Sequence, residues 1–207
     1  MNTSLDHVVL AVADLASAAD ELEKRHGLAS VAGGRHPGWG TENAIVPLGG
    51  TYLELIAVAD EAEAAASPLG RWVAAGSDGG PRPLGWAVRT DDLEVVAERL
   101  GLAARSGSRS TVDGEELRWR YAGVEQAMDE ACLPFFIEWA EGAPFPGRAG
   151  SPQLGLRELR LTGDPARLAD WLGAKDLPVV IEPGPAAVVR VVLDGPGRTV
   201  VLSGDGT

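Results

Sequence analysis

A strand, an aspartate and an amphipathic helix recur three times along the 207-residue chain, and this repeat constrains the fold most. Asp14, Asp92 and Asp164 each follow an apolar, strand-like segment and precede apolar residues with helical spacing. The intervals between the three aspartates are 78 and 72 residues. Recurrence at such an interval indicates a repeated supersecondary unit. The chain is therefore expected to contain three copies of one unit.

The first unit, residues 1–58, has the pattern of a strand, a helix and two further strands. An apolar strand over residues 5–12 leads to a helix that begins after Asp14 and ends at Gly27. Strands over 43–48 and 51–58 are separated by Gly49 and Gly50, which is typical of a short hairpin. Residues 33–41 are rich in glycine and are predicted to be a loop, with room for one more strand around 29–32.

The rest of the chain repeats this pattern less clearly. Residues 59–83 have the composition of a connector, with a short helix expected over about 67–75. Residues 84–140 form a second unit, and residues 151–207 form a third, degenerate unit with expected strands at 156–162, 188–193 and 199–202. The predicted fold class is α+β.

Composition points to a protein that acts on small molecules. The formal net charge of −12 argues against a nucleic-acid binder and against an anionic membrane surface, since both favour basic proteins. Neither a secretion signal nor an apolar stretch of membrane-spanning length is apparent, so a cytoplasmic location is expected. Cys132 is the only cysteine, which leaves no intrachain disulfide and no thiolate metal cluster.

His7 and Glu54 are single polar residues in otherwise apolar strands, where burial is costly unless the group is hydrogen-bonded, paired or ligated. The second unit carries Trp86 and Glu138 in similar places, at a separation of 52 residues against 47 in the first. Paired units would bring His7, Glu54 and Glu138 to one apolar-walled pocket. Trp86 would then lie on its wall. Adjacent carboxylates repel, so a cation or a shared proton is expected between them, and a shared proton would make one a general acid or base. Without metal, His7 could pair directly with a glutamate.

Five short motifs, in this order and spacing, resemble the vicinal oxygen chelate superfamily and within it the glyoxalase-like domain proteins. The resemblance covers residues 1–150 well and the third unit only in outline. It implies paired βαβββ modules that form cupped mixed sheets. The motifs span residues 5–9, 38–43, 52–55, 85–88 and 134–139.

The resemblance also implies a divalent metal, here Zn²⁺, Mn²⁺, Ni²⁺ or Mg²⁺, held by His7, Glu54 and Glu138. Trp86 occupies a ligand position of the family but cannot ligate. The implied activity is metal-assisted isomerase or lyase chemistry on a substrate with vicinal oxygens, with Glu54 and Glu138 as catalytic groups. A ring-cleaving dioxygenase is disfavoured, because its two-histidine, one-carboxylate set cannot be assembled at these positions.

Four residues are expected to line the substrate pocket: Arg35, Asn43, Trp86 and Phe136. Two rival interpretations stay open. The chain could be a metal-free small-molecule binding protein of the bleomycin-resistance type, or a catalytically inert glyoxalase-like protein. A homodimer also stays open, because the sequence does not decide whether the two units pair within one chain or between chains.

Overall fold

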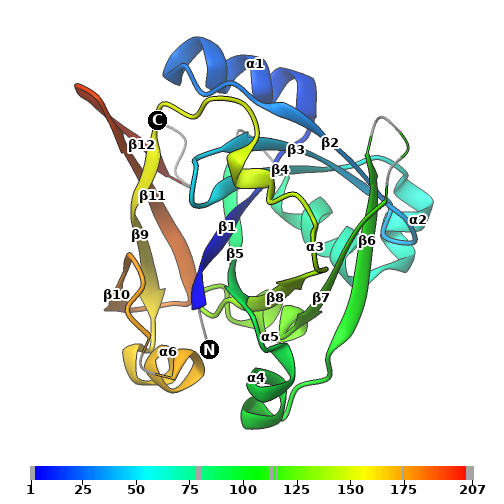
Figure 1. Cartoon of the computed structure of the whole chain (residues 1–207), viewed down its shortest axis with the longest axis vertical. Helices are drawn as coiled ribbons and strands as arrows, with labels where there is room; N and C mark the ends of the chain where they lie inside the picture. The colour runs from blue at the N-terminus through cyan, green and yellow to red at the C-terminus, as the bar shows by residue number, and fades with distance from the viewer. Residues whose placement is uncertain (1–2, 78–80, 112–113, 115, 174, 204–207) are drawn as a thin grey trace.

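The computed structural model describes residues 3–77, 81–111, 114, 116–173 and 175–203. The strands form two sheets: β1–β8 close into a barrel, and β9–β12 form a separate four-stranded sheet. In Figure 1 the four-stranded sheet lies on the left, with α1 at the top and α4 and α6 at the bottom. The fold class predicted from the sequence is confirmed: the protein is α+β and is built from repeated strand–helix–strand units.

The first unit comprises β1 (Thr3–Ala11), α1 (Leu15–His26), β2 (Val31–His36), β3 (Thr41–Pro47) and β4 (Tyr52–Val58). Two helices follow, α2 (Glu61–Ala66) and α3 (Pro68–Gly76). The second unit comprises β5 (Arg82–Thr90), α4 (Leu93–Leu100), β6 (Arg105–Thr111), β7 (Glu116–Ala122), α5 (Val124–Asp129) and β8 (Phe135–Trp139). After a short 3₁₀ helix, η1 (Pro146–Arg148), the third comprises β9 (Gly155–Gly163), α6 (Pro165–Leu172), β10 (Val179–Pro183), β11 (Ala187–Gly195) and β12 (Arg198–Ser203).

The three recurring aspartates cap the helices as the repeat predicts. Asp14, Asp92 and Asp164 each accept a hydrogen bond from a backbone N–H in the first turn of α1, α4 and α6. The three helices end at glycines with φ between 58° and 67°, a left-handed conformation that costs other residues more. The repeat is therefore a structural one.

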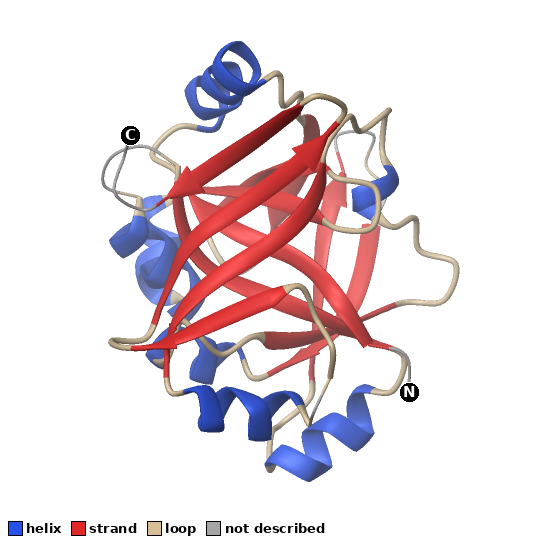
Figure 2. Cartoon of the chain, turned by 90° about the vertical axis from the view of Figure 1, so that its left-hand side faces the viewer, coloured by secondary structure: helices blue, strands red, loops and turns tan. Residues whose placement is uncertain are grey.

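The barrel joins two similar halves. Its strand order is β1-β4-β3-β2-β6-β7-β8-β5, so the first strand of each half pairs in parallel with the last. Antiparallel pairs β1–β5 and β2–β6 join the halves within one chain. Figure 2 shows the strands crossing the view with helices packed around them. Alternate residues of β1 and β4 thus face outward into the main core or inward into the barrel.

The third unit has the same elements but pairs them differently. Its strand order is β10-β9-β11-β12, so its first strand, β9, lies between β10 and β11. Within each half of the barrel, by contrast, the first strand pairs with the last strand of that half. Residues of β9 and β11, such as Leu159 and Val191, share one core cluster with Val8 and Trp86 of the barrel. The Trp171 indole of α6 donates a hydrogen bond to the Pro134 carbonyl oxygen at 2.8 Å. This unit covers the outer side of the barrel.

Two barrel strands differ from the prediction. β2 runs through residues 31–36, where glycines predicted a loop beginning at 33, and β6 has the polar sequence Arg-Ser-Gly-Ser-Arg-Ser-Thr, which gave no strand signal. These two strands pair with each other where the halves meet. Backbone pairing with a neighbour on each side outweighs weak intrinsic strand preference. The connector helix expected over about 67–75 is confirmed as α3.

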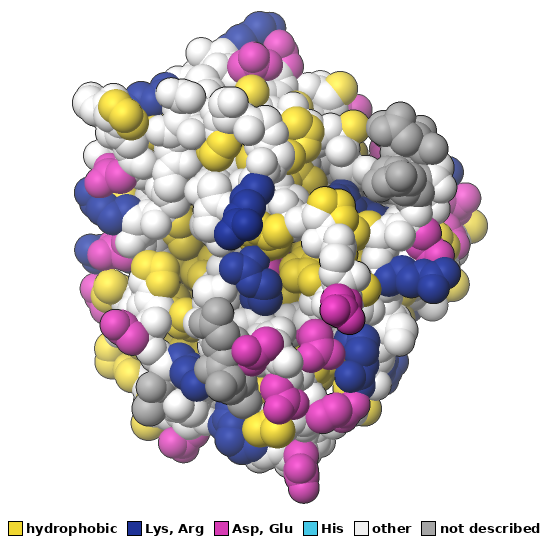
Figure 3. Space-filling model, viewed as in Figure 1, with side chains coloured by type: hydrophobic (Ala, Val, Ile, Leu, Met, Phe, Trp, Pro, Cys, Tyr) yellow, Lys and Arg dark blue, Asp and Glu magenta, His cyan; other side chains and the backbone are white. Residues whose placement is uncertain are grey.

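Charged side chains of both signs are interspersed over the described part of the face shown in Figure 3, with hydrophobic side chains between them. No helix among the described residues is both long enough and apolar enough to span a membrane.

Candidate active site

A cavity of about 150 Å³ lies inside the barrel, between the inner faces of its strands and helix α3. A cavity of this volume holds a ligand about the size of a benzene ring. Much of its wall is aromatic, and the polar side chains His7, His36, Asn43, Glu54 and Arg109 also line it. The aromatic lining residues are Trp39, Tyr52, Trp72, Trp119, Tyr121, Phe135 and Trp139.

A β-bulge in β1 sets the orientation of His7. Leu5 pairs with Val88 and His7 with Ala87, so Asp6 is an extra residue in the ladder. The fully buried Asp6 carboxylate lies 2.7 Å from His7 Nδ1 and accepts hydrogen bonds from the Trp139 indole at 3.0 Å and from Arg89 at 3.4 Å. Because a carboxylate accepts at Nδ1, that nitrogen carries a proton and Nε2 faces Glu54.

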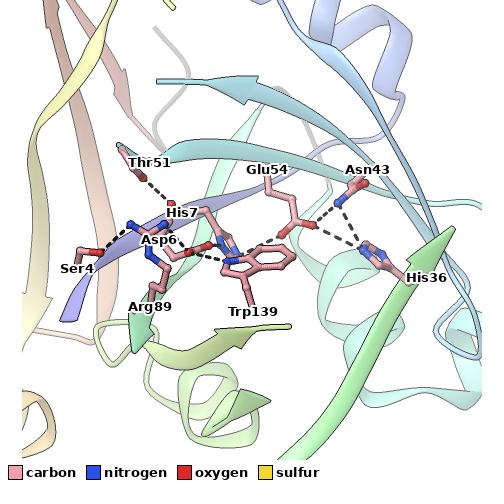
Figure 4. Close-up of polar contacts among 9 residues, drawn as sticks. All are labelled: Ser4, Asp6, His7, His36, Asn43, Thr51, Glu54, Arg89 and Trp139. Carbon is pink, nitrogen blue, oxygen red and sulfur yellow. Dashed lines mark hydrogen bonds and ion pairs between the residues drawn. The ribbon is translucent and has the colours of Figure 1, made fainter. Parts of the chain in front are cut away.

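Glu54 of β4 is the centre of the polar group, as Figure 4 shows. One carboxylate oxygen lies 3.4 Å from His7 Nε2, and the other accepts a hydrogen bond from Asn43 Nδ2 at 2.5 Å. His36 Nε2 lies 3.8 Å from that second oxygen. The side chain is 12% exposed and opens into the cavity. A carboxylate in this position can exchange a proton with an imidazole or with a bound molecule.

Four polar contacts hold the side chain of Asn43 of β3. Its Oδ1 accepts from the Gly34 backbone N–H at 2.9 Å and from Arg109 at 3.0 Å, while its Nδ2 donates to Glu54 and lies 3.5 Å from His36 Nε2. Two donors on one side and an acceptor on the other fix the orientation of the amide. Asn43 therefore links the carboxylate of Glu54 to the guanidinium of Arg109.

Two buried groups beside Glu54 are uncharged at neutral pH. Burial lowers the pKa of His36 to about 4, an effect that the nearby Glu54 carboxylate offsets only in part. Burial, followed by the charges of Asp6 and Glu54, raises the pKa of Tyr52 well above its usual value. The Tyr52 ring stacks on His7 with ring centroids 4.7 Å apart.

Gly33 of β2 leaves the space that Asn43 and Arg109 occupy. A Cβ at residue 33 would lie 1.9 Å from Asn43 Oδ1 and 2.5 Å from an Arg109 guanidinium nitrogen. Gly33→Ala is expected to lower the free energy of unfolding by about 2 kcal/mol, since overpacking forces side chains and backbone to shift. Urea denaturation measures the change. Gly50→Ala, where a Cβ has no neighbour within 4 Å, is the control and should change stability little; equal effects would contradict the crowding at residue 33.

The structure does not bring Glu138 to His7 and Glu54. In β8 the residues that line the cavity are Phe135, Ile137 and Trp139, so Glu138 points to the opposite face. There it accepts hydrogen bonds from Arg120 and from the Leu93 backbone N–H, each at 3.3 Å. Because side chains alternate between the two faces of β8, the prediction that Glu138 meets His7 and Glu54 at one metal site is wrong.

The predicted place of Trp86 is also wrong, because this residue lies in the core and not on the cavity wall. It is fully buried, pairs with Val8 across the ladder and donates its indole N–H to the Cys132 carbonyl oxygen at 3.2 Å. His7 lies seven residues before Asp14, and seven residues before Asp92 stands Gly85. The true counterpart of His7 is therefore Gly85.

At the two positions equivalent to His7 and Glu54, the second half of the barrel has aromatic rings instead of polar groups. A Cβ at Gly85 would lie 2.7 Å from the Trp72 ring, so that indole takes the place of a side chain. Val9 pairs with Glu54, and its counterpart Ala87 pairs with Phe135, so Phe135 stands where Glu54 stands in the first half. The second half of the barrel therefore has no metal-ligating side chain at the positions that correspond to His7 and Glu54.

Two other residues expected at the pocket lie outside it. Phe136 faces outward and packs against Trp171, with ring centroids 6.2 Å apart. Arg35 is exposed and donates a hydrogen bond to the Ala59 carbonyl oxygen at 3.2 Å. Of the residues proposed from the sequence, His7, Glu54 and Asn43 lie together in the cavity.

The donor set does not fit a divalent metal. Among the described residues, no three His, Cys, Asp or Glu side chains are placed to hold an ion together. His7 and Glu54 face each other directly, and the guanidinium of Arg109 lines the same cavity. A cation there would meet a fixed positive charge.

Three polar residues of the site were not identified from the sequence as site residues: Asp6, His36 and Arg109. Asp6 precedes His7 directly, but strict alternation places neighbours on opposite faces, and only the bulge brings them together. His36 and Arg109 lie on the two strands whose composition hid them. The signal in β6 is the spacing of Arg105 and Arg109, which are four residues apart and so lie on one face of the strand. The sequence of β2 offers no such signal.

Comparison with known proteins identifies the family. The sequence profile of the glyoxalase-like domain matches residues 5–176. A hypothetical protein from Staphylococcus aureus has a similar structure, with a TM-score of 0.76, 16% identity and coverage of 95% of this chain and 93% of that one. Methylmalonyl-CoA epimerase in complex with methylmalonyl-CoA and NH₄⁺ has a TM-score of 0.50 at 19% identity, over 69% of this chain and 99% of that one. A variant of methylmalonyl-CoA epimerase from Streptomyces coelicolor, bound to 2-nitronate-propionyl-CoA, has a TM-score of 0.50 at 19% identity, over 70% of this chain and 99% of that one.

No curated protein matches the sequence. At these identities the structural likeness shows the fold, whereas the profile covers most of the chain. The chain belongs to the glyoxalase-like domain family.

Proposed function

We propose that this glyoxalase-like protein is an enzyme that moves a proton on a small carbonyl compound, with Glu54 as the base. The single observation that supports this most is the Glu54 carboxylate, which is nearly buried between two imidazoles and opens into an aromatic cavity. A general base must lie within reach of a bound substrate and be shielded from bulk water. Glu54 meets both requirements.

The proposed step is removal of a proton from a carbon next to a carbonyl. The C–H bond breaks, its electron pair moves onto the carbonyl oxygen, and the proton resides on Glu54. Return of that proton to the other face of the same carbon, as the electron pair moves back from the oxygen, gives an isomer inverted at that carbon. His7 Nε2, 3.4 Å from Glu54, is placed to share the proton, and Asp6 holds the ring in that orientation.

The metal-assisted form of this chemistry, at two vicinal oxygens, would need three side chains placed to hold an ion together. His36 Nε2 lies 3.8 Å from Glu54, but among the described residues no three His, Cys, Asp or Glu side chains are so placed. Glu138 lies on the other face of β8, and Gly85 and Phe135 supply no donor. We therefore assign the proton transfer to the side chains alone and include a chelator in its test.

A binding protein of the drug-sequestering kind is the second candidate. The observation that favours it is the number of aromatic rings that meet at the cavity wall, with Trp119 contacting both Trp39 and Trp139 at centroid distances of 6.4 and 5.7 Å. Aromatic side chains around a cavity can bind a planar molecule without catalysing any reaction. Such a protein would retain its ligand affinity when Glu54 is replaced.

Proton exchange in D₂O tests the proposed function. The protein is incubated with simple 2-oxo acids and with acyl thioesters, the class bound by the epimerase neighbour, and loss of the C–H signal is followed by proton NMR. Glu54→Gln is expected to slow exchange at least about 100-fold, because it removes the general base. Glu138→Gln is the control and should leave the rate unchanged, as should a chelator. Exchange that survives Glu54→Gln would refute the assignment of the base.

A further inference from the structure

Arg109 is a buried cation in the wall of the cavity. Its side chain lies on β6 and the residue is 7% exposed. Within the described part of the chain, no carboxylate lies within ion-pair distance of it, and its one hydrogen-bond acceptor there is Asn43 Oδ1. A buried charge without an opposite charge is costly unless something else compensates it. A bound anion would supply that compensation.

Asn43 keeps Arg109 apart from the base. The amide lies between them, with its oxygen toward the guanidinium and its nitrogen toward Glu54. Without this spacer, the two opposite charges would pair directly and neutralise each other. A guanidinium has five N–H donors, and a carboxylate is the planar acceptor that two of them fit.

The space around Arg109 is shaped for a flat molecule. Gly33 has no side chain, and the guanidinium of Arg109 lies within 2.5 Å of the place that a Cβ there would take. The rings of Trp39 and Trp119 contact each other edge to face and line the same cavity, whose volume is about 150 Å³. Aromatic walls favour a planar body, and the volume limits it to about one ring or a short unsaturated chain.

We propose that Arg109 is the anion-binding group of this cavity and that its ligand is a small, planar carboxylic acid. The carboxylate of the ligand meets the guanidinium, and its apolar body lies against the tryptophans. This names the substrate class of the cavity and so rests in part on the proposed function, but binding at Arg109 does not require Glu54 to act as a base.

Benzoate and benzamide are suitable probes, because they share a ring and a planar head group and differ in charge. Binding is measured by tryptophan fluorescence and by NMR titration at neutral pH. The wild-type protein is expected to bind benzoate at least about tenfold more tightly than benzamide, since hydrogen bonds between charged partners are the stronger ones. Arg109→Gln should abolish this preference and retain benzamide binding.

Arg118→Gln is the matched control on the neighbouring strand β7. The Arg118 side chain is 71% exposed, pairs with Glu116 at 2.6 Å and is not among the residues that line the cavity. This variant should keep the preference for benzoate. Arg109→Lys, which retains the charge, should keep a reduced preference and serves if Arg109→Gln does not fold. Equal binding of the two probes by the wild type, or a preference that survives Arg109→Gln, would overturn the proposal.

The two proposals can fail separately. If Glu54→Gln keeps the benzoate preference but proton exchange is never detected, the anion site stands and the assigned chemistry falls. If exchange depends on Glu54 while Arg109→Gln leaves the benzoate preference intact, the chemistry stands and the anion site falls.

Discussion

Trp86→Ala is expected to lower the free energy of unfolding by about 4 kcal/mol, the loss typical of a large aromatic side chain removed from a packed core. The Trp86 side chain contacts neither solvent nor the cavity. Its exposed fraction is 0%, and it belongs to the core shared by the barrel and the third unit. Its truncation also leaves the Cys132 carbonyl oxygen without the indole donor. Urea denaturation followed by circular dichroism measures the loss.

Trp39→Ala provides the comparison, because this half-buried tryptophan lines the cavity and lies outside the core cluster. Its replacement should cost less than half as much stability and should weaken ligand binding instead. Trp86→Phe, which keeps most of the volume, covers the case in which the alanine variant does not fold. A loss below about 1 kcal/mol for Trp86→Ala would place the residue outside the core.

Acid is expected to destabilise the protein through His36. The unfolded chain binds a proton at this residue near pH 6.5, whereas the folded protein does so only near pH 4. Between these values the unfolded state holds more protons, so stability that is present above pH 6.5 is lost as the pH falls. The shift corresponds to about 3 kcal/mol, at 1.36 kcal/mol for each pKa unit.

The comparison of wild type with His36→Gln isolates this effect. Between pH 7 and pH 4 the wild type should lose about 3 kcal/mol more of its unfolding free energy than the variant does. His26→Gln is the control: His26 lies near the surface at the end of α1, and burial lowers its pKa less. Parallel pH profiles for wild type and His36→Gln would show that His36 is not held neutral.

Much of the fold could be predicted because the signals that set it are local. The caps Asp14, Asp92 and Asp164 and the glycines that end the helices act within a few residues. β2 and β6 could not be predicted in the same way, since their pairing depends on partners distant in the sequence. The rearranged order of the third sheet likewise depends on tertiary packing.

For the site, the sequence indicated His7, Glu54 and Asn43 but erred over the second unit. The sequence comparison aligned His7 with Trp86, one residue away from its true counterpart Gly85. In a strand, a shift of one residue moves a side chain to the opposite face of the sheet. The same one-residue difference moves the inward position of β8 from Glu138 to its neighbours. Asp6 was hidden for the opposite reason, because a bulge suspends the alternation on which such arguments depend.

The unequal halves of the barrel give its cavity a direction. A symmetric duplication would place equal polar groups at both ends, and a small ligand could then enter in two equivalent ways. Here His7 and Glu54 occupy one half, while the Trp72 ring beside Gly85 and the Phe135 ring occupy the other. A molecule with one polar and one apolar end therefore has a single favourable orientation in the cavity.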